Sequence, residues 1–393
     1  MIFLQKMKMF NLKNFILLTI FCLPSYLIKG PFFNLLDVLM IVTIIGWLFS
    51  RPKLINFFLA FWSLHKKVFL AFSLVILGIS VATLKGGNIS VGLGVLKSWF
   101  ILPFVFSLVA LSVFAEQKEK KKLLGAYFWS AFFVSCLSLI FWTQGKVTYD
   151  FRLMGIFNSP NYLAMYIAPA FLLGTVFFMT SYTRASLKNK LINLLLIITM
   201  LFVIYLTKSY ASWLAIGASL LIVVLIVYKN KIKIFVASLI LIISGLFFCS
   251  SLNLSSKDIF SERSSLNSRI IIWKSSEKII KDNWLWGIGP SNFQNKYLEY
   301  QKYFPPYLEW AVPHPHNLYL GFWLSGGIFS LAGFIYLIFL GLQAFARSKK
   351  KSSLVGALVI LLYLLLHGVL DTTYFKNDLA IVFWLSYLYL YLL

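Results

Sequence analysis

Residues 268–293 read SRIIIWKSSEKIIKDNWLWGIGPSNF and belong to the only long polar segment of this chain, residues 253–317. The segment closes with PHPHN at 313–317, directly before a new apolar run. The rest is dominated by apolar runs, so the chain is 60% hydrophobic and only 12% charged, with a mean hydropathy of +0.84. A soluble domain of this size does not need so much apolar surface. The composition therefore predicts a membrane protein with many spans.

Apolar runs of about 20 residues can each cross a bilayer as one helix. The sequence predicts an all-α polytopic membrane protein with about 12 transmembrane helices, at 13–28, 32–50, 67–84, 91–114, 123–143, 161–181, 190–206, 209–228, 232–252, 318–345, 352–370 and 377–393. The run 54–63 is too short to span and is expected at the membrane interface. The first run lacks a small-residue cleavage site and is interpreted as a retained span.

The basic charge follows the topology. The net charge is +24, and more than half of the 36 Lys and Arg residues cluster in every second connection, around 6–13, 51–67, 118–122, 184–190, 229–233 and 347–351. This positive-inside pattern places both termini in the cytoplasm and the segment 253–317 outside. These basic residues are therefore expected to lie near the lipid bilayer, and no nucleic-acid partner is expected. The three cysteines fall within predicted spans and offer no metal-ligand spacing.

Asp37 and Lys97 are charged residues that lie inside predicted spans, one to two turns from the outer end of each. Charges inside a membrane are costly, and they are usually paired or functional. The plain interpretation is a structural pair between Asp37 and Lys97. The alternative is that Lys97 lines an anion site reached from the outer leaflet.

Two further cations lie in external connections. In DFRLMGIFNSPN, residues 150–161, Gly155 permits a turn and the run 158–160 marks a helix start. Arg152 is thus expected near a helix N-terminus, where backbone N–H groups favour anions. A contact with lipid headgroups explains it equally well. Lys208 occupies the tight corner between two spans, where snorkelling to the interface is a sufficient explanation.

In the polar segment, isoleucines and a tryptophan recur at helical spacing from 268 to 281. The spacing predicts an amphipathic helix that lies on the membrane. Arg269 falls on the apolar stripe, so its guanidinium needs a partner. That partner is a carboxylate such as Glu262 or Asp37, or else a phosphate, which suits the planar guanidinium.

The PHPHN segment is expected to be stiff, because each X-Pro step holds the chain extended and the next helix follows at once. His316 is thus expected at the mouth of the bundle, as a general base or hydrogen-bond partner. The structural alternative is a helix cap formed with Asn317. His314, one residue further out, is expected to face water. His367 and Asp371, four residues apart on one helix face, are interpreted as a capping pair or as residues that orient the site.

Together these motifs resemble the bacterial O-antigen ligase and polymerase superfamily. The resemblance rests, in order, on Arg152-x-x-Gly155-x-Phe157-x-x-Pro160-Asn161, Arg269-x-x-x-Trp273, Asp282-Asn283-x-Leu285-x-Gly287-Ile288-Gly289, His314-x-His316-Asn317-x-Tyr319-Leu320 and His367-x-x-x-Asp371. Each motif is short, but their order, spacing and shared outer side make the resemblance specific over residues 150–372. It divides the chain into an N-terminal bundle (1–150), a ligase-like catalytic region (151–372) and a last helix (373–393).

The resemblance implies a C-type glycosyltransferase fold in the bacterial inner membrane, with no required metal or other cofactor. Such enzymes move a glycan from undecaprenyl diphosphate to a hydroxyl of an acceptor glycolipid or glycan. It makes Arg269 the diphosphate clamp and His316 the candidate base. The other expected site residues bind diphosphate or glycan (Arg152, Lys208, Lys97, His314 and Asn317) or support those that do (Tyr210, His367, Asp371 and Asp37).

One position departs from the family. Its members usually carry a Ser-Arg pair where this chain has Ser209-Tyr210. Lys208 could supply the missing charge, although an ammonium is a point donor and not a fork. The alternatives are that Lys208 and Arg152 cover the role, that the acceptor differs, or that the protein is inactive.

The motifs do not separate a ligase from a polymerase or a protein glycosylase. A secondary transporter with 12 helices is the rival class. Such transporters hold polar residues and broken helices near the midplane of the membrane. This chain keeps its charged residues at the outer ends of the spans, which favours the transferase.

Overall fold

The computed structural model describes residues 2–30, 33–50, 54–181, 186–227, 265–305, 311–349 and 351–392. Within these residues the chain is helical, and the two isolated β-bridges do not extend into strands. The helices are α1 (Ile2–Phe21), α2 (Leu35–Ser50), α3 (Leu54–Lys85), α4 (Ile89–Val95), α5 (Leu102–Val113), α6 (Gln117–Thr143), α7 (Pro160–Ser181), α8 (Leu187–Leu206), α9 (Tyr210–Val227), α12 (Ser265–Asp282), α13 (Phe293–Tyr300), α14 (Leu318–Arg347), α15 (Lys351–His367) and α16 (Asn377–Tyr391). Two short 3-10 helices, η1 (Leu23–Leu27) and η3 (Gln301–Tyr303), and one π-helical turn, η2 (Leu96–Ile101), complete the set.

The helices fit an all-α membrane protein. Among the described residues, 6 helical stretches are long and apolar enough to cross a membrane: Trp62–Lys85, Ile89–Val113, Gln117–Thr143, Pro160–Thr180, Leu187–Leu206 and Leu318–Arg347. Four shorter apolar helices lie at Asn11–Phe21, Leu35–Ser50, Tyr210–Ile226 and Lys351–His367. The span predicted at 232–252 lies outside the described residues. The total of about 12 spans therefore stays a prediction.

The run 54–63 is not a separate surface element. It forms the beginning of α3, and only His65, with φ −122° and ψ 28°, departs from helical geometry along that helix. A kink at this point joins the short run to the predicted span that follows.

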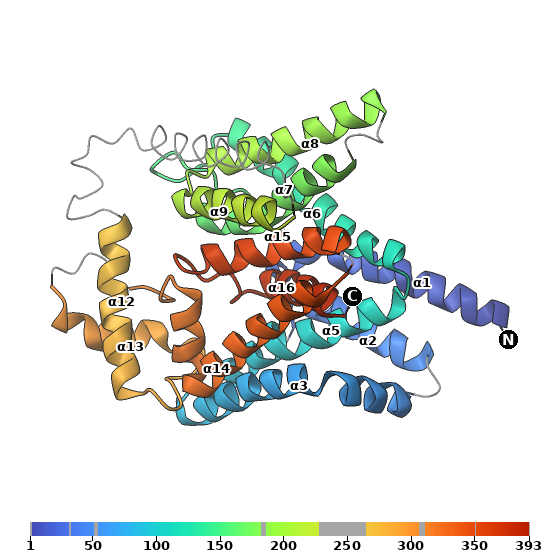
Figure 1. The fold of residues 1–393 in the computed structure, drawn as a ribbon. Helices are drawn as coiled ribbons and strands as arrows, with labels where there is room; N and C mark the ends of the chain where they lie inside the picture. The colour runs from blue at the N-terminus through green and yellow to red at the C-terminus, as the bar shows by residue number, and fades with distance from the viewer. Residues whose placement is uncertain are drawn as a thin grey trace.

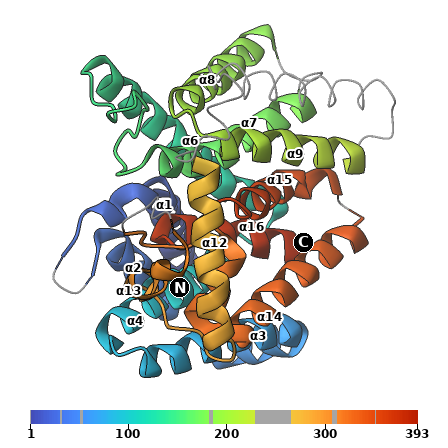
Figure 2. The same ribbon diagram turned by 90° about the vertical axis from the view of Figure 1, so that its left-hand side faces the viewer.

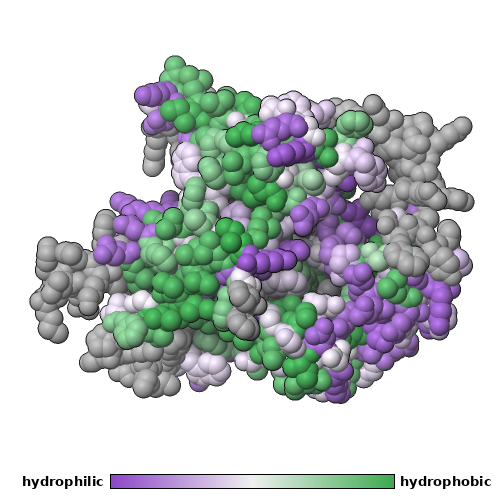
Figure 3. Space-filling view, turned by 180° about the vertical axis from the view of Figure 1, so that it is seen from behind, coloured by the Kyte–Doolittle hydropathy of each residue, from purple (hydrophilic) through white to green (hydrophobic). Residues whose placement is uncertain are grey.

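The long helices run side by side, and α12 and α13 close one end of the bundle (Figure 1). Figure 2 looks onto this end and shows α12 lying across it. The N-terminus of α1 lies at the opposite end of the molecule (Figure 1). Hydrophilic residues gather at the α12–α13 end, whereas hydrophobic side chains cover much of the remaining surface in the same view (Figure 3). This division of polarity is typical of a helix bundle set in lipid with one polar end.

Two contacts between connections, one at each end of the bundle, agree with the sides of the membrane that the charge pattern predicts. At the α12 end, the loop before α7 is joined to the end of α8, because Leu153 N donates to the carbonyl of Leu206 at 2.9 Å. At the other end, Lys13 of α1 pairs with Glu119 of α6 at 2.7 Å. Connections predicted on the same side of the membrane thus meet in the fold.

The polar segment is attached to the bundle where α14 is broken. Gly326 and Gly327 have non-helical geometry, with Gly327 at φ 66° and ψ −163°. The break leaves backbone groups of α14 unpaired within the helix, and the turn after α12 satisfies them. Ile288 N donates to Leu324 O at 2.8 Å, and Ile328 N donates to Trp284 O at 3.1 Å. The α14 backbone therefore positions the turn that follows α12.

Replacing Gly327 should destabilise the protein strongly. A Cβ at this position would lie 2.0 Å from Leu285 O, and the backbone angle is one that side chains rarely adopt. The strained conformation alone costs roughly 1–3 kcal/mol. We expect Gly327→Ala to lower the melting temperature of the purified protein, whereas Gly125→Ala, in α6 with nothing within 4 Å of the added Cβ, should not. Equal melting temperatures for the two variants would contradict this contact.

The helix predicted at 268–281 is present as α12 and begins at Ser265. Its buried face carries Ile272, Ile279 and Ile280, which pack with the α13 residues Phe293 and Tyr297. Burying an isoleucine side chain contributes roughly 1.5–3 kcal/mol. The apolar stripe expected to face lipid is thus covered by the protein itself. This packing fixes the orientation of α12, and with it the position of Arg269.

Candidate functional site

The PHPHN segment, residues 313–317, forms a hook that leads into α14. His316 has a positive φ of 46°, which few residues other than glycine adopt. Asn317 is the N-cap of α14, and its Oδ1 accepts from Tyr319 N at 2.9 Å and from Leu320 N at 3.0 Å. The sequence offered a base or a helix cap as alternatives for this segment. In the structure Asn317 is the cap, and the imidazole of His316 takes no part in it.

The hook is held from two sides. Trp273 of α12 donates its Nε1 proton to Pro315 O at 3.1 Å. On the other side, Asn317 Nδ2 donates to Val369 O at 2.9 Å and Leu318 N donates to Gly368 O at 2.6 Å. These bonds fix His316 relative both to α12 and to the connection between α15 and α16.

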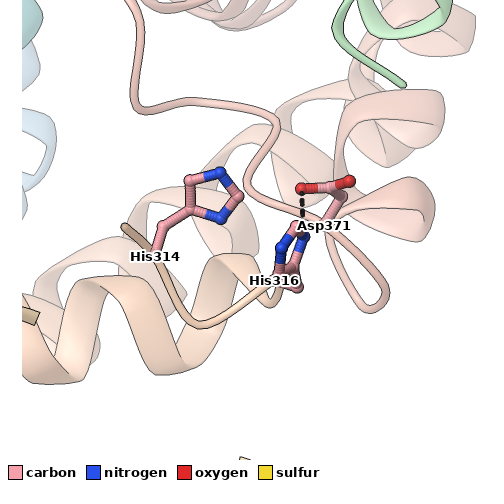
Figure 4. Close-up of side chains that lie close together, drawn as sticks. All are labelled: His314, His316 and Asp371. Carbon is pink, nitrogen blue, oxygen red and sulfur yellow. Dashed lines mark hydrogen bonds and ion pairs between the residues drawn. The ribbon is translucent and has the colours of Figure 1, made fainter. Parts of the chain in front are cut away.

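His316, Asp371 and Arg269 meet at this point. His316 Nδ1 lies 3.2 Å from Asp371 Oδ1, a contact drawn in Figure 4. Arg269 Nη2 lies 4.0 Å from the other oxygen, Asp371 Oδ2. The carboxylate is only 2% exposed and the Arg269 side chain 15%. Asp371 is therefore a buried anion set between a guanidinium and an imidazole.

Arg269 was expected to pair with a carboxylate such as Glu262 or Asp37, or else with a phosphate; its carboxylate partner is Asp371, and Glu262 lies outside the described residues. The expectation for Asp371 was wrong. Asp371 was expected on the helix face of His367, but α15 ends at His367 and Asp371 lies in the following turn. His367 instead places its Nδ1 2.7 Å from the hydroxyl of Tyr363. The turn rotates the carboxylate away from the helix and toward the hook.

Charge keeps Asp371 ionised. Burial alone would raise the pKa of this carboxyl group, but its electrostatic interaction and hydrogen bond with His316 outweigh burial and hold the pKa well below its ordinary value. The Arg269 guanidinium favours the anion in the same way. With an ionised Asp371 accepting from Nδ1, His316 holds its proton on Nδ1 and leaves Nε2 as an acceptor.

Arg152 lies beside this cluster. Its Nε donates to Thr207 O at 2.8 Å, and its Nη2 donates to Oδ1 of Asn161, in the first turn of α7, at 2.5 Å. The expected place near a helix N-terminus is confirmed. Burial lowers the pKa of Arg152, and the nearby positive charge of Arg269 lowers it further, against the opposing effect of Asp150. Two guanidinium groups that repel one another in partly buried positions favour an anion between them.

Lys208 lies next to the Arg152 loop. Its backbone has a positive φ of 47°, and its Nζ is 3.5 Å from Asp150 O. Tyr210, the first residue of α9, lies near the Arg152 side chain. The structure thus groups Arg152, Lys208 and Tyr210 at one corner of the α12 end, with Arg269 adjacent.

Asp37 and Lys97 form the pair that their burial required. Lys97 Nζ lies 3.2 Å from Asp37 Oδ2. Ser98 donates to the same oxygen at 2.6 Å, and Asn377 Nδ2 donates to Asp37 Oδ1 at 3.1 Å. Lys97 and Ser98 belong to the π-helical turn η2, which lets these consecutive residues reach one carboxylate. The plain interpretation, a structural pair, is confirmed; a role for Lys97 in anion binding stays a prediction.

His314 does not face water as expected. Its ring lies 4.3 Å from that of His316, centroid to centroid, and the two rings are drawn together in Figure 4. The residue is half-buried, and its Nδ1 is enclosed without a hydrogen-bond partner among the described residues. The extended X-Pro geometry directs this side chain back toward the protein surface beside α13 and not into solvent.

His314 gives the protein a pH-dependent stability. Burial lowers the pKa of His314 to about 4, whereas an unfolded chain protonates histidine near about 6.5. The unfolded state binds more protons between these values, so stability falls as pH falls through this window, by roughly 3 kcal/mol in total. We expect a lower melting temperature at pH 5 than at pH 7.5, and a smaller difference for His314→Asn. An unchanged difference in that variant would show that another group is responsible.

The same cluster could hold a metal ion. His314, His316 and Asp371 each offer a ligand atom, and these atoms lie within 4.8 Å of one another. Two imidazoles and a carboxylate suit a divalent cation such as zinc. The guanidinium of Arg269, however, lies against the same carboxylate and competes with a cation for it. A reaction that does not require a metal stays our expectation.

The sequence did not single out Trp99 or Lys376, and it gave Trp273 no role in the site. Trp273 was assigned to the apolar stripe and to the Arg269-x-x-x-Trp273 motif, and in the structure its indole nitrogen holds the hook. Trp99 lies in η2 and lines a cavity beside the hook together with Lys376. A signal for Lys376 was present, because it is a lone basic residue in the external connection 371–376, where the charge pattern does not require one.

Comparison with known proteins bears on this geometry. Residues 195–335 match the family described as O-Antigen ligase. The matched stretch runs from α8 into α14 and includes Lys208, Arg269 and both hook histidines, while Arg152 and Asp371 lie outside it. No curated protein matches the chain. Over residues 195–335, this chain is similar to the O-antigen ligase family.

Proposed function

We propose that this protein is a multi-pass glycosyltransferase of the bacterial inner membrane that moves a glycan from undecaprenyl diphosphate to an acceptor hydroxyl. In this proposal both termini are cytoplasmic and the α12 end is external. One observation carries the proposal: a buried row of Arg269, Asp371 and His316 at the polar end of an apolar helix bundle. This row combines a guanidinium that can bind a diphosphate, Arg269, with an imidazole that can accept a hydroxyl proton, His316.

The arginines have the chemistry needed on the donor side. When the bond between the sugar anomeric carbon and the diphosphate oxygen breaks, negative charge develops on the diphosphate. Fixed cations aimed at developing charge stabilise a transition state strongly. Arg269 and Arg152 are rigid guanidiniums at the end of the bundle where a lipid-linked diphosphate would meet the external surface, and Lys208 adds an ammonium.

His316 has the chemistry needed on the acceptor side. As the acceptor oxygen forms its bond to the anomeric carbon, its proton passes to His316 Nε2. The imidazole becomes a cation, which the ionised Asp371 stabilises through Nδ1. The products are the glycosylated acceptor, undecaprenyl diphosphate and a proton held by His316, so atoms and charge balance. Asn317 and Trp273 keep this imidazole oriented while the proton moves.

The test is transfer by the purified protein in nanodiscs that contain a glycan on undecaprenyl diphosphate. One set receives an acceptor glycolipid, and a second set receives only more of the lipid-linked glycan. Product in the first set supports an O-antigen ligase, and elongation in the second supports a polymerase of the same superfamily. A chelator is added to half of each set, and unchanged product is expected. Glycan movement across a sealed vesicle with no covalent product would establish a transporter instead.

Lys208 offers a further test of the donor side. Lys208 is a cation within two residues of Tyr210, which stands where the family usually has arginine. Lys208→Ala should reduce transfer about a hundredfold if the ammonium stabilises the diphosphate, with the melting temperature unchanged. Lys190→Ala, at the opposite end of α8, is the matched control. Normal transfer by Lys208→Ala would assign the missing charge to Arg152 or Lys97.

A further inference from the structure

A cavity of about 300 Å³ opens beside the hook. Its wall is formed by the turn before α13, by residues 313–315 of the hook and by the connection before α16. His314 belongs to this wall, whereas Arg269, Arg152 and His316 do not. The cavity thus adjoins His314, and neither His316 nor an arginine contributes to its wall. Its volume is at the lower end of the range of small-ligand sites.

The apolar part of the wall is aromatic and rigid. Trp99 donates its Nε1 proton to Asn377 Oδ1 at 3.0 Å, and Tyr374 donates its hydroxyl proton to Trp99 O at 2.8 Å. Phe375, also in the wall, lies 6.1 Å from Trp99 between ring centroids. With the indole nitrogen occupied, Trp99 offers the cavity only its apolar ring. Rigid aromatic rings of this kind suit the C–H faces of a sugar ring.

The polar part of the wall has hydrogen-bonding capacity and one charge. Gln294 and Ser291 line the cavity, and so does the ammonium-bearing Lys376. Lys376 makes no ion pair with any residue in the described part of the chain. Its Nζ lies 5.6 Å from the centre of the Tyr162 ring. The nearby carboxylate of Asp378 accepts instead from the Tyr162 hydroxyl and from Leu379 N.

His314 supplies an independent sign that the cavity takes a polar ligand. Its Nδ1 is enclosed and has no hydrogen-bond partner among the described residues. Leaving such a nitrogen without a hydrogen bond is unfavourable. The His314 side chain also lines the cavity, and the neutral imidazole that burial favours can accept a hydrogen bond from a hydroxyl group of a ligand.

We infer that this cavity is the acceptor subsite and that it takes an acidic saccharide, whose ring lies against Trp99 and Phe375 and whose anionic group pairs with Lys376. The inference rests on the proposed transfer reaction only in naming this cavity the acceptor subsite. The binding of an acidic sugar at this cavity does not depend on that reaction. The arginines then serve the donor diphosphate, and the hook separates the two substrates.

A larger cavity of about 690 Å³ lies between residues 85–87 and the α12–α13 pair. None of the candidate site residues lines it. One of its lysines, Lys296, has an acidic neighbour, since its Nζ lies 2.7 Å from Glu299 Oε2, whereas Lys85 Nζ lies 5.3 Å from the centre of the Trp286 ring. Lys296, a lysine paired with a carboxylate, therefore provides a matched control for Lys376.

The experiment measures sugar binding to the full-length protein in zwitterionic nanodiscs without any donor, by ligand-observed NMR titration. The probes are methyl β-glucuronide and methyl β-glucoside, which differ only at the carboxylate. Wild type should bind the glucuronide about fivefold more tightly, as one solvent-accessible ion pair allows. Lys376→Gln should remove this preference and leave glucoside binding unchanged, while Lys296→Gln should keep the preference. Melting temperatures establish that each variant is folded.

Equal binding of the two glycosides by wild type, or a preference that survives Lys376→Gln, would overturn the inference. So would displacement of the glucuronide by inorganic pyrophosphate at lower concentrations than free glucuronate requires, because the cavity would then be a donor phosphate site. These measurements use no transfer. If transfer fails while the preference is found, the proposed reaction is wrong and the sugar site stands; transfer without the preference overturns this inference alone.

Discussion

His316→Ala should slow single-turnover glycan transfer by about a hundredfold to ten-thousandfold, the usual contribution of a general base. At 1.36 kcal/mol per tenfold, this corresponds to roughly 3–5 kcal/mol of transition-state stabilisation. The reason is geometric: Nδ1 is taken by Asp371 at 3.2 Å, so Nε2 is the nitrogen that can accept a proton. Donor binding, measured separately with a nonreactive lipid diphosphate, should be largely kept because the arginines remain.

Comparing His314→Ala with His316→Ala distinguishes a catalytic base from a residue that only contacts the acceptor. The His314 side chain lines the cavity beside the hook. Its removal should raise the acceptor concentration needed for half-maximal rate and leave the rate at saturating acceptor close to that of wild type. An equal loss of rate from both variants, or loss of donor binding in His316→Ala, would make the hook a structural clamp.

Arg269→Gln should lower transfer by about a hundredfold to a thousandfold, the effect of removing one charge-stabilising donor. It should also destabilise the protein, because breaking a buried ion pair by removing one partner costs about 3–5 kcal/mol. Asp371, 2% exposed, would lose the guanidinium at 4.0 Å. Arg269→Lys should recover part of the stability and less of the rate, since an ammonium cannot replace the planar fork.

The control for Arg269 lies on the same helix. Lys281 is 71% exposed and pairs with Glu277, one turn earlier on the same helix. Lys281→Ala should match wild type in transfer and in melting temperature, because exposed pairs contribute little. If Arg269→Gln also matched wild type in transfer while its stability fell, Arg269 would be a partner of Asp371 and not a donor clamp.

The sequence predicted the helices well because their signals are local. Apolar length marked the spans, Asn158-Ser159-Pro160 marked the start of α7, and the stripe from 272 to 280 marked α12. Positive-inside charge predicted which connections meet, and Lys13–Glu119 agrees with it. The pairing of Asp37 with Lys97 followed from the cost of burying either charge alone.

The partners across the site could not be predicted in the same way. Whether Arg269 pairs with Asp37, Glu262 or Asp371 depends on where α12 lies across the bundle, and the glycine contacts at the break in α14 decide that. The helical interpretation of Asp371 failed because a spacing of four residues places two side chains on one face only while the helix continues, and α15 ends at His367. His314 was placed in water because the tertiary wall around it consists of residues distant in the sequence.

The most direct measurement of the central claim is a single-turnover reaction in which released undecaprenyl diphosphate and glycosylated acceptor are quantified in the same sample. The account predicts equal amounts of the two products from wild type, both appearing at the same rate. Both should slow together in His316→Ala. Release of undecaprenyl diphosphate without glycosylated acceptor would make the protein a hydrolase, and no release at all would contradict the account.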